Sequence, residues 1–349
     1  MTNKKAWIIG WVFWATCLLS FTDGFKFDYP DFVQPKNFPP PQYNFSKNRQ
    51  TEAGFQLGRK LFYDPILSRD SSTSCSSCHL QATGFTHVDH DVSHGIEGRK
   101  GTRNSMALIN LAWNTSFHWD GGVNNLEVQA INPITNPMEM DNSLENALKS
   151  LNKSAIYKTY FFKAFGDSVA TSQNMLKALA QFTVSFVSYN SKYDKYVRHE
   201  MGGDMTEQEL NGLKLFRINC ASCHKEPLFT DFSFQNNGLT IDTFYKDLGR
   251  YQITQNPVDS FKFKVPTLRN IEFTFPYMHD GRFKKLKEVI NHYTSENTEG
   301  GIQKSTTLAK ELQTPIKLNP NEKKDLIAFL LTLTDFEFLS DKKFGFPPE

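Results

Sequence analysis

The sequence has almost no net charge, few strand patterns and only five cysteines in 349 residues. Its 39 Lys and Arg nearly balance 37 Asp and Glu, for a formal charge of +2. This balance gives no reason to expect a nucleic-acid partner. Because few stretches alternate apolar and polar residues, we expect an all-α fold with long loops. The length allows two domains of ordinary size.

The N-terminus has the order of residues found in export signals. Basic "MTNKK" is followed by apolar "AWIIGWVFWATCLLSF" and then by polar "TDG". The apolar run is short for a membrane span, so we predict a signal peptide at 1–24 and a periplasmic location. An uncleaved N-terminal anchor is the alternative. A proline-rich segment at 25–50 is expected to be extended.

Four cysteines lie in two identical patterns, "CSSCH" and "CASCH", made by Cys75, Cys78, His79, Cys220, Cys223 and His224. Exported cysteines normally form disulfides. Two thiols one helical turn apart, with histidine next, are instead the attachment pattern of c-type haem. A redox dithiol would not need the histidine, and a Cys₄ zinc site would need the two distant pairs to converge. We therefore predict two covalently bound haems c.

Helical patterns surround both motifs. "GFQLGRKLFYD" precedes the first motif, and a later stripe consists of Met175, Leu179, Phe182 and Phe186. "TEQELNGLKLF" begins with a capping-box pattern and leads to the second motif. Near the end, Asn319 is the expected N-cap of a helix with an apolar face made by Leu326, Leu330 and Leu333. The simplest architecture is two cytochrome c-type domains, 51–200 and 201–349, each with one haem.

The ligand at the sixth position of each iron separates electron carriers from catalysts. Near the first motif the candidates are His87, His90, His94, Met106 and His118. Near the second motif they are Met278, His279, His292 and Tyr293. The residue types alone do not choose among them.

The chain from about Thr51 to Asp335 resembles the dihaem bacterial cytochrome c peroxidase family, and within it the MauG-like subgroup. The resemblance is carried by "LGRKLFYDPILS", "KGTRNSMALIN", "HWDGG", "LEVQAINPITNPMEM", "FKVPTLRN", "PYMHDGRF" and the two haem motifs. It implies His79 and His224 as iron ligands and Trp119 between the haems. It also implies Gln129 and Glu139 above a peroxide-binding haem. One calcium ion would be held by Asn104, Thr274 and the Pro276 carbonyl, with waters completing its shell.

Three positions distinguish this chain within the family. Ile96 stands where members that need reductive activation have a removable histidine, and His94 would reach that position only if the loop shifted. The resemblance thus implies a first haem that is permanently open. Tyr293 stands where conventional members have a methionine ligand, as in MauG-type enzymes, and Met278 is the alternative ligand. Ile218 replaces the surface tryptophan through which MauG oxidises its partner.

These features predict an exported dihaem peroxidase with an N-terminal peroxide-binding haem and a C-terminal electron-transfer haem. Its electron donor would be a small protein such as a cytochrome c or a copper protein. The first alternative is a MauG-type oxidase that modifies side chains of a protein substrate. The second is a dihaem electron carrier without catalysis.

Overall fold

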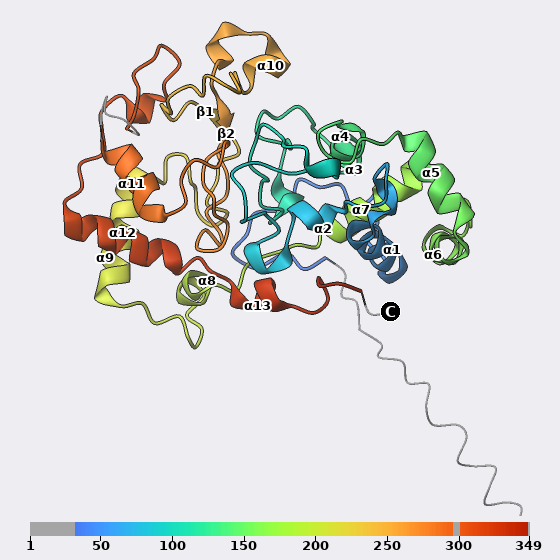
Figure 1. Cartoon of the computed structure of the whole chain (residues 1–349). Coiled ribbons are helices and arrows are strands. Elements are labelled where there is room, and N and C mark those ends of the chain that lie inside the picture. The colour runs from blue at the N-terminus through green and yellow to red at the C-terminus, as the bar shows by residue number, and fades with distance from the viewer. Residues whose placement is uncertain (1–31, 296–300, 348–349) are drawn as a thin grey trace, which may run out of the picture. The chain divides into compact units, whose positions relative to one another are not determined.

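The structure is a computed structural model that describes residues 32–295 and 301–347 (Figure 1). The predicted signal peptide lies outside the described residues. Residues 296–300, which follow Tyr293 in the sequence, also lie outside them.

Helices dominate the described chain. The α-helices of the first half are α1 Glu52–Tyr63, α2 Cys75–Cys78, α3 Leu126–Gln129, α4 Ile131–Thr135, α5 Leu144–Lys153, α6 Ala155–Phe165, α7 Ser172–Thr183 and α8 Lys192–Val197. Those of the second half are α9 Glu207–Asn219, α10 Tyr251–Thr254, α11 Leu286–Thr294, α12 Pro320–Leu331 and α13 Phe336–Ser340. Short 3₁₀ turns are η1 Pro65–Leu67, η2 Gln81–Thr83, η3 Ile96–Gly98, η4 Leu111–Trp113, η5 Pro257–Asp259 and η6 Lys310–Leu312.

Two strands of two residues form the sheet of the described chain. β1 Phe234–Gln235 pairs antiparallel with β2 Phe263–Lys264. A helix-rich fold with little sheet is therefore confirmed.

The predicted helix starts are present. The Thr206 hydroxyl accepts the N–H of Glu209, and the Glu209 carboxylate accepts the N–H of Thr206 at 2.6 Å, so the capping box begins α9. Asn319 caps α12, with Pro320 as its first residue. Both caps satisfy N–H groups that have no partner inside the helix.

Two predicted apolar stripes extend one turn too far. Helix α7 ends at Thr183, so Phe186 lies beyond it, and α12 ends at Leu331, so Leu333 lies beyond it. Both side chains are nevertheless fully buried. Phe186 stacks on Phe85 with ring centroids 3.9 Å apart. The chain after each helix folds back onto the same core, which preserves burial without helical geometry.

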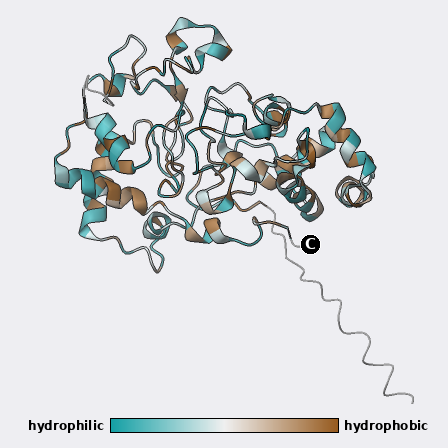
Figure 2. Ribbon diagram, in the orientation of Figure 1, coloured by the Kyte–Doolittle hydropathy of each residue, from teal (hydrophilic) through white to brown (hydrophobic). Residues whose placement is uncertain are grey.

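Two helix pairs repeat the same close packing, α1 against α7 and α9 against α12 (Figure 1). A Cβ on Gly58 of α1 would lie 2.0 Å from the carbonyl oxygen of Ala178 in α7. A Cβ on Gly212 of α9 would lie 2.0 Å from the carbonyl oxygen of Asp325 in α12. At both crossings the helix backbones meet because glycine has no side chain. Apolar residues concentrate where α9 and α12 meet (Figure 2).

A second repeat relates the segments 116–126, "SFHWDGGVNNL", and 276–286, "PYMHDGRFKKL". In each, a tight turn is closed by one backbone hydrogen bond of 2.7 Å, from Phe117 to Val123 and from Tyr277 to Phe283. His118 and Met278 occupy the same turn position with φ of 65° and 74°. The two halves of the chain therefore share a local design that our sequence analysis did not detect. Both belong to the compact unit Gln34–Glu349.

Candidate haem sites

The first cysteine motif forms one helical turn that ends at its histidine. The backbone N–H of His79 donates to the Cys75 carbonyl at 3.0 Å. The His79 ring places Nδ1 2.7 Å from the carbonyl oxygen of Phe85. A carbonyl can only accept, so Nδ1 carries the proton and Nε2 is left with a lone pair.

The second motif has the same arrangement. The N–H of His224 donates to the Cys220 carbonyl at 2.9 Å, and Nδ1 of His224 lies 3.1 Å from the Phe229 carbonyl oxygen. Phe85 and Phe229 are both fully buried with left-handed φ, 58° and 54°. This conformation is costly for a bulky residue. It turns each carbonyl toward its histidine, so the strain serves ring orientation.

Both histidines suit an iron ligand. Exclusion of water lowers the pKa of His79 to about 4 and also lowers the pKa of His224, so both rings are neutral near pH 7. A metal-binding imidazole is neutral and typically donates its other N–H to a carbonyl. The four cysteines of the two motifs form no disulfide, so their thiols are available. The motifs therefore fit covalently bound haem.

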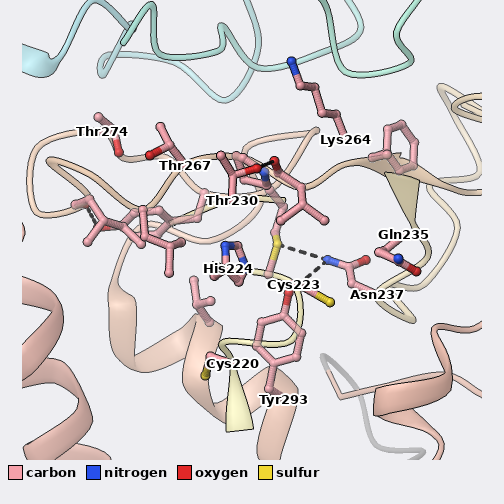
Figure 3. A pocket seen from close by; sticks show the side chains of 18 of the residues that line it. Cys220, Cys223, His224, Thr230, Gln235, Asn237, Lys264, Thr267, Thr274 and Tyr293 are labelled. Atoms are coloured by element: carbon pink, nitrogen blue, oxygen red, sulfur yellow. Dashed lines mark hydrogen bonds between the residues drawn. The ribbon is translucent and has the colours of Figure 1, made fainter. Parts of the chain in front are cut away.

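A cavity of about 250 Å³ opens beside the second motif. Its walls include Cys220, Cys223, His224, Met278 and Tyr293 (Figure 3). Most of the remaining lining is apolar, from α9, α11, α12 and the chain around β2. A mostly apolar cavity beside two thiols and a neutral imidazole suits a flat cofactor such as haem.

The two candidate distal ligands of this cavity share one hydrogen-bond donor. Nδ2 of Asn237 lies 3.5 Å from the Tyr293 hydroxyl and 3.3 Å from Sδ of Met278 (Figure 3). Burial raises the pKa of Tyr293 to about 12, and the Asn237 contact opposes this. Without a metal, Tyr293 is thus a neutral phenol. A bound cation would be needed to make it anionic.

Glu139 lies within electrostatic range of the first motif. Burial raises the pKa of the Cys75 thiol to about 12, and the Glu139 charge acts in the same direction. Burial also raises the pKa of Glu139, while a 2.9 Å hydrogen bond from Asn136 Nδ2 lowers it. The Glu139 carbonyl accepts the N–H of buried Ile96 at 2.8 Å. The loop that contains Ile96 therefore holds the backbone of Glu139.

Gln129 ends α3, and its side chain makes no hydrogen bond within the described residues. Nothing in these contacts joins it to Glu139.

The rings of His87, His90 and His94 pack on one another with centroids 3.8 to 6.1 Å apart. Nδ1 of His87 and Nε2 of His94 are buried without a partner. The part of the chain that the structure describes has no group of three His, Cys, Asp or Glu placed to hold a metal ion.

Trp119 connects the two halves of the chain. Its Nε1 donates to the Asn104 carbonyl at 2.8 Å, and its carbonyl accepts the N–H of Lys264 at 2.7 Å. Asn104 in turn places Nδ2 2.5 Å from the Pro276 carbonyl oxygen. Asn104, Pro276 and Thr274 all line the cavity of the second motif. The Asn104 side chain thus meets the Pro276 carbonyl through its Nδ2 donor, and this contact does not test the predicted calcium site.

Sequence reasoning missed Asn136, Asn237 and Lys264. Asn136 lies in "LEVQAINPITNPMEM", but nothing there shows that its side chain contacts Glu139, and Asn237 lies outside every recognised stretch. Lys264 lies in "FKVPTLRN", but nothing there shows that its side chain is buried. Only the folded chain reveals these neighbours.

The fold is helical, and each half of the chain contains one Cys-x-x-Cys-His motif. Residues 52–202 match the family model described as di-haem cytochrome c peroxidase. The chain is 34% identical over 311 residues to methylamine utilization protein MauG of Methylorubrum extorquens, covering 86% of this chain and 83% of that one. It is 35% identical over 283 residues to cytochrome c551 peroxidase of Nitrosomonas europaea, covering 80% and 79%. A crystal structure of a MauG-like protein associated with microbial copper homeostasis superposes with a TM-score of 0.82 at 33% identity, covering 91% of this chain and 99% of that one.

The chain belongs to the di-haem cytochrome c peroxidase family. It is a haem-dependent oxidoreductase of the peroxidase type. The predicted family and class of enzyme are thereby confirmed. Within residues 32–295 and 301–347, no helix is long and apolar enough to cross a membrane.

Proposed function

We propose that this protein is an exported dihaem peroxidase that reduces hydrogen peroxide at its first haem. Each haem would be bound through the thiols and the histidine of one motif, within cytochrome c-type domains at 51–200 and 201–349. The observation that carries the proposal is the repeated histidine geometry, in which Nδ1 of His79 and of His224 faces a buried carbonyl oxygen. When bound, haem supplies the redox chemistry that breaks the O–O bond.

Glu139 is the proposed acid and base at the first haem. Its carboxylate accepts a proton from one oxygen of hydrogen peroxide and returns it to the other, which leaves as water. The raised pKa of Glu139 suits this exchange, since a group that alternates as base and acid works best with a pKa near the working pH. Gln129 is proposed to orient the peroxide by hydrogen bonding. Ile96 offers no ligand atom, so no activation step is expected.

Tyr293 is the proposed distal ligand of the second haem, with Met278 as the alternative. Phenolate is a hard anionic donor, so it favours oxidised iron more than a thioether does. Trp119 is proposed to connect the two haems, because hydrogen bonds join it to segments from both halves. Two electrons and two further protons complete the reduction of one peroxide to two waters.

The electrons are proposed to come from a small cytochrome c or copper protein. Oxidation of side chains in a protein substrate is the second candidate, since the relatives include proteins named MauG. Ile218 is 79% exposed beside the second motif but cannot carry charge as a tryptophan does. The exposed isoleucine therefore favours reduction of peroxide over oxidation of a protein substrate. A dihaem carrier without catalysis would not need a buried carboxyl group such as Glu139.

We further propose that the protein is periplasmic, with an N-terminal signal or anchor. One calcium ion is proposed at Asn104, Thr274 and the Pro276 carbonyl. Calcium takes six to eight oxygen ligands, so water would supply most of its shell.

Electron paramagnetic resonance of the ferric protein tests the haem assignment. An open first iron predicts a high-spin signal, and a second iron with two protein ligands predicts a low-spin signal. Tyr293→Phe should alter only the low-spin signal, whereas Tyr189→Phe, outside the cavity, should leave both unchanged. Two low-spin signals that persist in Tyr293→Phe would disprove both ligand assignments.

A further inference from the structure

Lys264 is a buried cation without a carboxylate partner. Its residue is only 3% exposed, and it takes part in no ion pair within the described chain. Two other lysines of this half differ: Lys262 lies near Asp259, and Lys284 pairs with Asp91. Buried ammonium groups are normally paired because removing their charge from water is expensive. A missing partner therefore needs an explanation.

Ser116 is the residue whose polar groups lie near the Lys264 ammonium. Nζ donates to the carbonyl of Ser116. An ammonium has three N–H groups, so two remain available. The hydroxyl of the same Ser116 is buried and has no partner. Two unsatisfied donors in one place fit an acceptor that belongs to a bound molecule.

Two aromatic rings also lie near the Lys264 ammonium. Nζ lies 5.7 Å from the ring centroid of Phe117 and 5.7 Å from that of Phe232. Two rings can partly offset the burial of the cation. They do not replace an anion, since exclusion of water still lowers the pKa of Lys264 to about 7.

The location of Lys264 identifies the bound molecule. The residue lines the cavity of the second motif, and its N–H holds the carbonyl of Trp119. Its amine points away from His224, toward the segment of the first half that includes Ser116 (Figure 3). This amine therefore lies where the wall of the second cavity meets the first half of the chain. Haem carries two propionate carboxylates, which are the anions expected there.

We propose that Lys264 and Ser116 form a carboxylate-binding site that holds a propionate of one haem. This inference rests on the proposed attachment of two haems. The Lys264 ammonium neutralises the propionate, and the Ser116 hydroxyl donates a hydrogen bond to it. The pair would thereby set the reduction potential of that haem.

Spectroelectrochemical titration of the dihaem protein tests the site. Removing a cation beside a propionate leaves more negative charge near the iron, which favours the ferric state. Lys264→Met should therefore lower the midpoint potential of one haem. Ser116→Ala should lower the same potential by less, and Lys264→Arg should restore it. Lys262→Met removes the same charge two residues away and is the matched control, with both potentials unchanged.

The haem whose potential falls is the one that supplies the propionate. Equal potentials in Lys264→Met and wild type, with both haems attached, would overturn the inference, even if the variant is less stable. If Lys264→Met does not fold, an unchanged potential in Ser116→Ala overturns it instead. A protein that carries fewer than two haems by mass would contradict the proposed function itself.

Discussion

The packing of α9 against α12 makes Gly212→Ala a sharp test of the structure. The new Cβ would lie 2.0 Å from the Asp325 carbonyl oxygen and 2.7 Å from Cβ of Phe329. Neither atom can move unless the helices separate. Overpacking of this kind costs about 1–3 kcal/mol, and a backbone contact belongs at the upper end. Alanine returns about 1 kcal/mol through helix propensity. The net expected loss is about 2 kcal/mol.

Guanidinium unfolding of the haem-loaded protein measures this loss. The midpoint should fall while the slope stays the same, because stability changes and the surface exposed on unfolding does not. Lys214→Ala, on the exposed side of α9, controls for propensity and should not lower the midpoint. Gly58→Ala should behave like Gly212→Ala, since its Cβ would also lie 2.0 Å from a carbonyl oxygen. A guanidinium midpoint of Gly212→Ala at or above that of wild type would refute the close contact between the backbones of α9 and α12.

Two further predictions concern the first haem and the proposed ion. The Asn136 hydrogen bond lowers the pKa of Glu139, so Asn136→Ala should raise that pKa further. The rate of the peroxide reaction should then begin to fall at a higher pH as the solution is acidified. An unchanged pH profile would show that Asn136 does not tune Glu139. Elemental analysis of the purified protein should find one calcium, and its removal by a chelator should slow electron transfer between the haems, whereas a calcium-free preparation of full activity would eliminate the proposed ion.

The sequence alone was sufficient to predict where the helices α9 and α12 begin. The capping box of α9 and the N-cap of α12 are local, since the partners lie within three residues, so they could be predicted. The family and the class of enzyme could also be predicted, because each stretch that carries the resemblance is contiguous in the sequence. Helix ends were less predictable: Phe186 and Leu333 keep the apolar spacing but leave the helix, since burial alone does not require helical geometry.

The contacts that shape the sites could not be predicted from sequence. Asn237 reaches Tyr293 across 56 positions, and Lys264 reaches Ser116 across 148. No periodicity connects such distant residues. The left-handed Phe85 and Phe229 were missed for a different reason: bulky residues disfavour this conformation, and only the core that surrounds them enforces it.

Stopped-flow mixing of the resting ferric protein with hydrogen peroxide tests the central claim most directly. The account predicts a rapid change in the haem spectrum without prior reduction. It also predicts a rate about 10²–10⁴-fold lower in Glu139→Gln, as expected when a general acid and base is lost. Glu145→Gln, an exposed carboxylate on α5, should react like wild type. A ferric protein that ignores peroxide, or a Glu139→Gln variant as fast as wild type, would contradict the account.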